Sequence, residues 1–235
     1  MNLNSPTTMT RIRNLLNDLE AVRENLLALS DDIWQAIDHN DPDSLEAGVE
    51  FKRAYNTQAA AFDKNATELS TLVQKYTSVR LEEAEKTGGR NDAENERIIR
   101  DLNREEPHRL DENFTYKRPH GFVLDGRATT GITTWQRLYE LVCHQLLAAD
   151  EDRFRSLEEH PDFISPRGHR IVTRDRVSLR KAMELPGDLF IESNLSANSI
   201  CDVIRRILGE FGIPEDRMQI YLRQDRDAGR GEDAK

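Results

Sequence analysis

The chain has 235 residues, of which 37% are hydrophobic and 32% charged, and its formal net charge is −10 at pH 7. This length allows one large domain or two small ones, with a core that needs no disulfide or metal ion. The acidity lies in the N-terminal half: residues 1–112 contain 14 Lys and Arg against 23 Asp and Glu, and residues 113–235 contain 19 against 20. We therefore expect the N-terminal half to repel nucleic acids and anionic membranes, a constraint that the near-neutral second half does not share.

The two cysteines, Cys143 and Cys201, fall in amphipathic helical patterns with no second Cys or His at zinc-ligand spacing. The sequence thus predicts buried, reduced thiols and no metal or cofactor. The N-terminal segment lacks the apolar run of a signal peptide, and no stretch of 18 apolar residues occurs. We expect a cytosolic protein without a membrane partner.

The first predicted element is a long helix with a heptad repeat, capped at its start by Thr8 or Thr10. Its apolar residues fall on two heptad positions, the first containing Ile12, Leu19, Leu26 and Ile33 and the second containing Leu15, Val22, Leu29 and Ala36. Further apolar residues widen this stripe, so the helix should contact more than one neighbour. We predict an oligomer interface formed by Ile12, Leu15, Leu19, Val22, Leu26, Leu29 and Ile33, unless the C-terminal domain covers the stripe.

A turn around Pro42 separates this helix from a second one, with Asp41 as the N-cap and an end near Glu85. Apolar residues in the second helix alternate by four and three, at Tyr55, Ala59, Phe62, Ala66, Leu69, Val73 and Tyr76. Two helices of similar length joined by a short turn fold back antiparallel. Residues 1–88 are therefore predicted to form a coiled-coil-like helical hairpin that ends at Gly88 and Gly89.

For the rest of the chain, the sequence predicts three segments. These are a connector with a short helix at 89–112, a small α+β domain at 113–224 and a flexible tail at 225–235. Asp125 and Gly126 indicate a hairpin turn between two short strands. The further elements expected are a helix capped by Thr133 or Thr134 that ends near Ala149, a short helix within 150–163, strands at 171–173, 189–191 and 218–222, and a helix with Ile200 to Phe211 on its apolar face.

Two segments of this domain could bind an anion. The start of the last helix, at Asn194, Ser196, Asn198 and Ser199, offers free backbone N–H groups and polar side chains, although the same residue types also serve as ordinary caps. A basic stretch precedes it, containing Arg167, His169, Arg170, Arg174, Arg176, Arg180 and Lys181. It could contact nucleic-acid phosphates or the acidic hairpin of a second copy, or remain a solvated loop. If the two segments share one surface they form an anion site.

A smaller basic cluster, Lys117 to His120 with Tyr116 and Phe114 nearby, has the composition of a nucleic-acid surface or of an ordinary edge strand. Catalytic motifs for nucleotide binding, serine hydrolysis, zinc proteolysis and dithiol redox chemistry do not occur. A further alternative is a metal-dependent phosphodiesterase or nuclease using Asp125, His169 and Glu192, although the segment after Glu192 lacks the lysine that restriction-type nucleases place beside their acidic ligands.

The segments FIESNLSANSI at 190–200, FTYKRP at 114–119 and IYLR at 220–223 resemble C-terminal domains of uncharacterised bacterial proteins. The resemblance covers residues 96–224 and implies a link to phage defence or mobile elements, but it carries no catalytic residue. The leading hypothesis is a non-enzymatic interaction or regulatory protein, whose hairpin self-associates or docks to a partner and whose α+β domain recognises a ligand or macromolecule. The main alternative is a DNA- or RNA-associated regulator or defence component.

Overall fold

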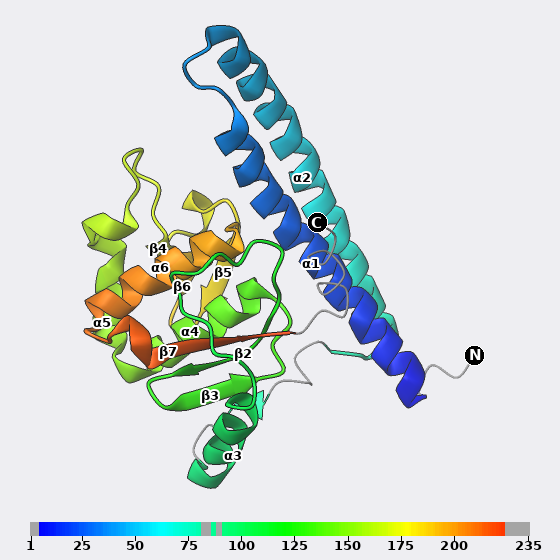
Figure 1. Cartoon of the computed structure of the whole chain (residues 1–235), viewed down its shortest axis with the longest axis vertical. Helices are drawn as coiled ribbons and strands as arrows, with labels where there is room; N and C mark the ends of the chain where they lie inside the picture. The colour runs from blue at the N-terminus through cyan, green and yellow to red at the C-terminus, as the bar shows by residue number, and fades with distance from the viewer. Residues whose placement is uncertain (1–4, 81–85, 88–90, 224–235) are drawn as a thin grey trace, which may run out of the picture.

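The computed structural model describes residues 5–80, 86–87 and 91–223 (Figure 1). The helices in this part of the chain are α1 (Pro6–Ala36), α2 (Pro42–Thr77), α3 (Asp92–Leu102), α4 (Trp135–Ala149), α5 (Glu151–Ser156) and α6 (Ala197–Glu210), with 3-10 helices η2 (Leu157–Glu159), η3 (Pro161–Phe163), η4 (Arg176–Ser178) and η5 (Glu215–Arg217). The strands are β1 (Lys86–Thr87), β2 (Pro119–Leu124), β3 (Arg127–Thr130), β4 (Val172–Thr173), β5 (Ala182–Leu185), β6 (Leu189–Glu192) and β7 (Met218–Leu222). The α+β class and the N-terminal hairpin are confirmed.

The ends of the hairpin helices differ in part from the sequence prediction. The side chain of Ser5, not of Thr8 or Thr10, caps α1, because its Oγ accepts the Thr8 N–H at 3.2 Å. Asp41 caps α2 as predicted. The second helix ends at Thr77, where Ser78 takes a left-handed conformation with φ 58°. The predicted helix end near Glu85 is therefore wrong, because the left-handed Ser78 stops the helix at Thr77. The predicted Gly88–Gly89 boundary and the predicted tail lie outside the described residues.

The two helices lie antiparallel and close together along their length. The Tyr55 hydroxyl donates a hydrogen bond to the Leu26 carbonyl at 2.8 Å, and Lys52 Nζ donates to the Ser30 carbonyl at 2.7 Å. Near the turn, the side chain of Ile37 occupies the space where a residue larger than Gly48 would place its Cβ. These contacts fix the register of the hairpin.

The seven strands named above form two antiparallel sheets with the strand orders β1-β3-β2-β7 and β4-β6-β5. The predicted turn at Asp125 and Gly126 joins β2 to β3, with φ of 47° and 79° at the two residues. Two strands, β1 and β5, have no counterpart in the prediction. Each of these short strands forms by pairing with a neighbouring strand, β1 with β3 and β5 with β6.

The main core lies around α4 and α6, and α4 contacts β2 of the first sheet and β5 of the second. Side chains alternate along β2, so Phe122 and Leu124 enter this core while Val123 joins Ile98 and Leu102 of α3 in a smaller cluster. Both faces of the first sheet are therefore covered. Within the described chain, none of the helices combines the length and apolar character that a membrane span requires.

The hairpin lies against one side of the α+β domain, with α1 nearer to the domain in the view of Figure 1, and Asp63 of α2 also reaches Lys181 of the domain. Polar contacts hold the two parts together. Arg118 Nη1 lies 3.0 Å from Asp18 Oδ1, the Tyr116 hydroxyl donates to Asp32 at 3.3 Å, and the Gln136 N–H donates to Glu24 at 3.0 Å. Several acidic side chains of the hairpin therefore bind residues of the α+β domain of the same chain.

Candidate anion site between the hairpin and the domain

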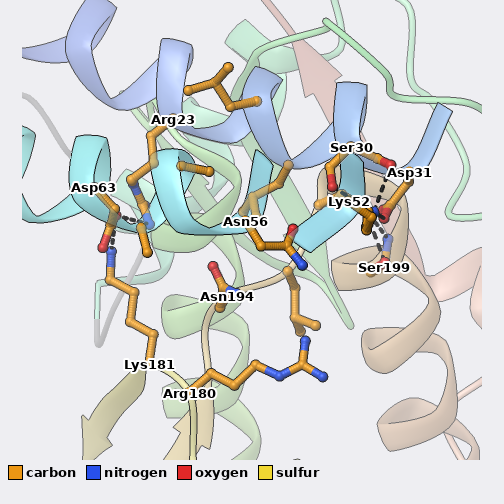
Figure 2. A pocket seen from close by; sticks show the side chains of 16 residues that line it. Arg23, Ser30, Asp31, Lys52, Asn56, Asp63, Arg180, Lys181, Asn194 and Ser199 are labelled. Carbon is orange, nitrogen blue, oxygen red and sulfur yellow. Dashed lines mark hydrogen bonds and ion pairs between the residues drawn. The ribbon is translucent and has the colours of Figure 1, made fainter. Parts of the chain in front are cut away.

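A cavity of about 750 Å³ lies between the inner face of the hairpin and the α+β domain (Figure 2). The hairpin contributes Arg23, Leu26, Leu27, Ser30, Asp31, Lys52, Asn56, Ala59, Ala60 and Asp63, and the domain contributes Arg180, Lys181, Asn194, Leu195, Ser196 and Ser199. Four of these side chains are cationic and two are carboxylates. The lining therefore has a formal charge excess of two positive charges, although the hairpin as a whole is acidic.

Most of the charged groups in the lining are already paired. Asp63 Oδ1 lies 3.2 Å from Arg23 Nη1 and 2.8 Å from Lys181 Nζ, so one carboxylate joins α1, α2 and the segment before β5. Lys52 Nζ donates to Ser30 Oγ at 2.6 Å and lies 4.0 Å from Asp31 Oδ1. These contacts give the cavity a fixed wall on the hairpin side.

Three polar side chains of the lining have no such partner. Arg180, Asn56 and Asn194 come from three different segments and lie facing the same space in Figure 2. None of the three side chains makes a hydrogen bond or ion pair to another residue that the structure describes. A guanidinium and two amides that converge on an open cavity can together bind a group with several oxygen acceptors.

Glu192, at the end of β6, positions the domain side of the cavity. Its carboxylate accepts the backbone N–H groups of Arg180 at 2.8 Å, Lys181 at 3.2 Å and Asn194 at 2.8 Å. The buried Ser193 adds a hydrogen bond from its Oγ to the Lys181 carbonyl at 3.0 Å. The pairing of Ala182 with Glu192 in the β5–β6 ladder brings the basic segment beside the start of α6.

The N-terminus of α6 faces the hairpin. Ser196 is the N-cap, and its Oγ accepts the Ser199 N–H at 3.4 Å. Both serines line the cavity, and with Asn198 they also line a neighbouring hollow of about 260 Å³ beside Asp31 and Asp32. Because Asp31 borders both spaces, a carboxylate of the same chain already lies near the positive end of this helix.

Two charged residues on the inner face of α1 are buried beside the cavity. Arg23 is 5% exposed and also contacts Glu20 and the side chain of Gln136. Glu24 is 7% exposed and accepts the Gln136 N–H in the first turn of α4. Burial raises the pKa of Glu24 to about 7, although the Gln136 N–H and Arg23 both act to lower it. Neither residue was predicted from the sequence, where the only signal is a charged pair inside an apolar heptad run.

The structure separates the predicted basic stretch into two parts. Arg180 and Lys181 reach the cavity, together with the predicted Asn194, Ser196 and Ser199. The earlier residues, Arg167, His169, Arg170, Arg174 and Arg176, do not line it. Of these, Arg170 lies 3.2 Å from Glu159 and Arg174 lies 3.7 Å from Glu158, whereas the rest are exposed.

Asn198 has a structural role at the start of α6. Its Oδ1 accepts the Phe114 N–H at 2.8 Å, and its Nδ2 donates to Asn113 at 3.1 Å and to Thr115 at 3.0 Å. These bonds tie α6 to the segment before β2. In that segment Phe114 is fully buried and Arg118 pairs with Asp18, so neither is free to contact a nucleic acid.

The weak nuclease alternative used residues that lie in different places. Asp125 is in the β2–β3 turn, 3.2 Å from Arg217, and Glu192 binds backbone N–H groups in the other sheet. His169 lies in an exposed loop. The three side chains therefore do not build one site.

A different group, His160, Asp162 and Glu210, has ligand atoms within 4.8 Å of one another. The contacts among these three residues account for their closeness without a metal ion. His160 Nδ1 accepts the Asp162 N–H at 3.4 Å, and His160 Nε2 lies 3.4 Å from Glu210 Oε1. Both cysteines are buried, and burial raises the pKa of each thiol, as expected for inert thiols.

Comparison of the chain with protein-family models, curated proteins and solved structures finds no match. The resemblance of residues 96–224 to bacterial proteins therefore remains a hypothesis, and the function must be argued from the geometry alone.

Proposed function

We propose that this chain is a non-enzymatic interaction protein, in which the hairpin mediates self-association or docking and the cavity between hairpin and domain recognises an anionic ligand. The observation that supports the ligand is the convergence of Arg180, Asn56 and Asn194, without partners among the described residues, on a cavity with excess positive charge. The cavity volume is in the range of sites for small molecules, about 300–1,000 Å³.

The chemistry of the lining favours a ligand with phosphate groups. A guanidinium donates two parallel hydrogen bonds to such a group, and carboxamide N–H groups add further donors. The carboxylates of Asp31 and Asp63 would repel an anionic ligand that contacted only the hairpin wall of the cavity. The anion should therefore lie toward Arg180 on the domain side.

The test is titration calorimetry with inorganic pyrophosphate as the probe, on the full chain. We expect binding that weakens as salt is added, and about 10- to 150-fold weaker binding for Arg180→Ala, since a hydrogen bond to a charged group contributes about 1.5–3 kcal/mol. Arg176→Ala is the matched control, because Arg176 is exposed in the same basic stretch but outside the cavity. Absence of pyrophosphate binding, or equal loss in both variants, would contradict the proposal.

The same variants separate this proposal from the nucleic-acid alternative. A single-stranded oligonucleotide that binds the chain, and loses affinity with Arg176→Ala but not with Arg180→Ala, would favour recognition through the exposed arginines of the 167–176 loop.

A further inference from the structure

The outer face of α2 carries a second heptad seam that the hairpin covers only in part. Its members alternate by four and three residues: Phe51, Tyr55, Gln58, Phe62, Asn65, Leu69, Leu72 and Tyr76. Tyr55 and Phe62 are half-buried and the others are exposed, with 47% of Leu69, 64% of Leu72 and 78% of Tyr76 accessible. An alternation by four and three is the pattern of a helix that packs against another helix along its whole length.

Apart from Tyr55, whose hydroxyl donates to the Leu26 carbonyl, the α1–α2 contact uses other residues. Ala59, Ala66 and Val73 are half-buried or buried, as are Ile12, Leu19, Leu26 and Ile33 of α1. Of the predicted oligomer interface, only Leu15, Val22 and Leu29 are exposed, and their helical spacing places them beside the α2 seam. The structure thus divides the predicted interface into an inner seam within the hairpin and an outer apolar face.

The order of apolar and polar residues in the outer seam is similar on both sides of Phe62. Tyr55 and Leu69 lie seven residues to either side, and Phe51 and Leu72 lie close to the ends. Its two polar members, Gln58 and Asn65, lie four residues before and three residues after Phe62. A copy of α2 packed antiparallel about Phe62 would place apolar residues against apolar residues and each Gln58 opposite an Asn65.

We infer that a second copy of this chain packs on the outer face of the hairpin, with the two α2 helices antiparallel about a two-fold axis near Phe62. The inference rests on the proposed role of the hairpin in self-association and names its partner and register. A two-fold interface requires a self-complementary surface, and the near-palindrome of the seam supplies one. Opposed amides would favour this register, because shifting it would place Gln58 or Asn65 against apolar side chains.

The size of the face fits a stable dimer. At 1.5 Å per residue the seam is roughly 38 Å long, and two adjacent helices are roughly 20 Å wide. Each copy therefore offers about 800 Å², the area per partner that a standard interface buries. The residues of α2 that line the cavity are Lys52, Asn56, Ala59, Ala60 and Asp63, none of which belongs to the seam, so association need not fill the cavity.

Light scattering on the full chain between about 1 and 200 μM tests the dimer, since interfaces of this size have dissociation constants of micromolar or below. We expect a dimer whose dissociation constant rises at least ~100-fold in a Leu69→Glu, Leu72→Glu variant, because burying an unpaired carboxylate is strongly unfavourable. Val177→Glu is the control, since Val177 is 90% exposed on the α+β domain. A monomer at all concentrations, or a dimer that survives the two seam substitutions, would overturn the inference.

Charge pairs test the register. The double variant Gln58→Lys, Asn65→Glu should dimerise, because each new cation faces a new anion of the other copy. The variant Gln58→Lys, Asn65→Lys should be monomeric, because like charges then oppose each other. Equal behaviour of the two variants would reject the antiparallel α2 pairing. Pyrophosphate titration of the monomeric variant distinguishes the two proposals, since the cavity should still bind pyrophosphate when the dimer is lost.

Discussion

Lys181 Nζ lies 2.8 Å from Asp63 Oδ1, so a side chain that precedes a short strand of the domain reaches across the cavity to the middle of α2. Arg23 Nη1 lies 3.2 Å from the same oxygen. Asp63 is thereby the one carboxylate of the cavity wall that joins both helices of the hairpin to the domain.

We expect Asp63→Asn to lower the free energy of unfolding by about 1–3 kcal/mol, because Arg23 is almost fully buried and loses one of its ionic partners. Urea denaturation measures this change. Glu68→Gln is the control, because Glu68 forms an exposed pair with Lys64 at 4.0 Å and should contribute at most about 0.5 kcal/mol. Equal effects of the two substitutions would mean that Asp63 does not stabilise the hairpin–domain contact.

Glu24 should make the stability depend on pH. Burial raises the pKa of Glu24 from the ordinary glutamate value of 4.5 to about 7 in the folded chain. Between these two pH values the folded chain holds a proton that the unfolded chain has released, so the free energy of unfolding falls as pH rises, by about 3 kcal/mol over the window. We expect Glu24→Gln to remove this slope in urea denaturation at pH 5, 6 and 7.5. Glu50→Gln, at an exposed position of α2, should retain it.

Substitution of Asn198 should affect the stability of the chain, whereas substitution of Asn194 should affect the binding of pyrophosphate. Asn198→Ala removes three hydrogen bonds at the start of α6 and should cost about 1–3 kcal/mol of stability. Its affinity for pyrophosphate should not change. Asn194→Ala removes a side chain without a described partner, so it should weaken pyrophosphate binding and leave stability within about 0.5 kcal/mol of the parent. Thermal denaturation and calorimetry on both variants measure the two properties, and the reverse pattern would contradict these assignments.

The sequence predicted the hairpin and most of the α+β elements because their signals are local: heptads, the caps at Asp41 and Thr134, and the Asp125–Gly126 turn. It could not decide which side of α1 faces α2, because the two heptad positions at Leu15 and Leu19 are both apolar. Only the rotation of the packed helices decides that, and it left Leu15 outside. The strand β5 was missed because its segment AMEL has only four residues and none that is β-branched or aromatic, and pairing with β6 determines it.

The candidate site could be predicted only in part. The start of α6 was found from its residue types, but Arg180 joins it through the register of β5 and β6, which no local pattern shows. The hairpin side was missed altogether. Asp63 and Lys52 look like ordinary solvated charges of an exposed helix, and they line a cavity only because the domain docks opposite them.

Two glycines in helices should respond oppositely to alanine. In a helix interior, alanine is favoured over glycine by about 1 kcal/mol. At Gly209, in the last turn of α6, a new Cβ meets no atom within 4 Å, so Gly209→Ala should raise the free energy of unfolding by about 0.5 kcal/mol. At Gly48 the new Cβ would overlap the side chain of Ile37, which must move away from the hairpin turn. We expect Gly48→Ala to destabilise the chain by about 1–3 kcal/mol, as overpacking of a core does.

The combined variant Gly48→Ala, Ile37→Ala distinguishes overpacking from other causes. Removing the Ile37 side chain abolishes the overlap, so the substitution at Gly48 should become neutral or favourable when compared with Ile37→Ala alone. Urea denaturation of the four chains in this double-mutant cycle gives the coupling free energy. If Gly48→Ala is as harmful without Ile37 as with it, the close approach of these two residues does not explain why α2 contains a glycine at this position.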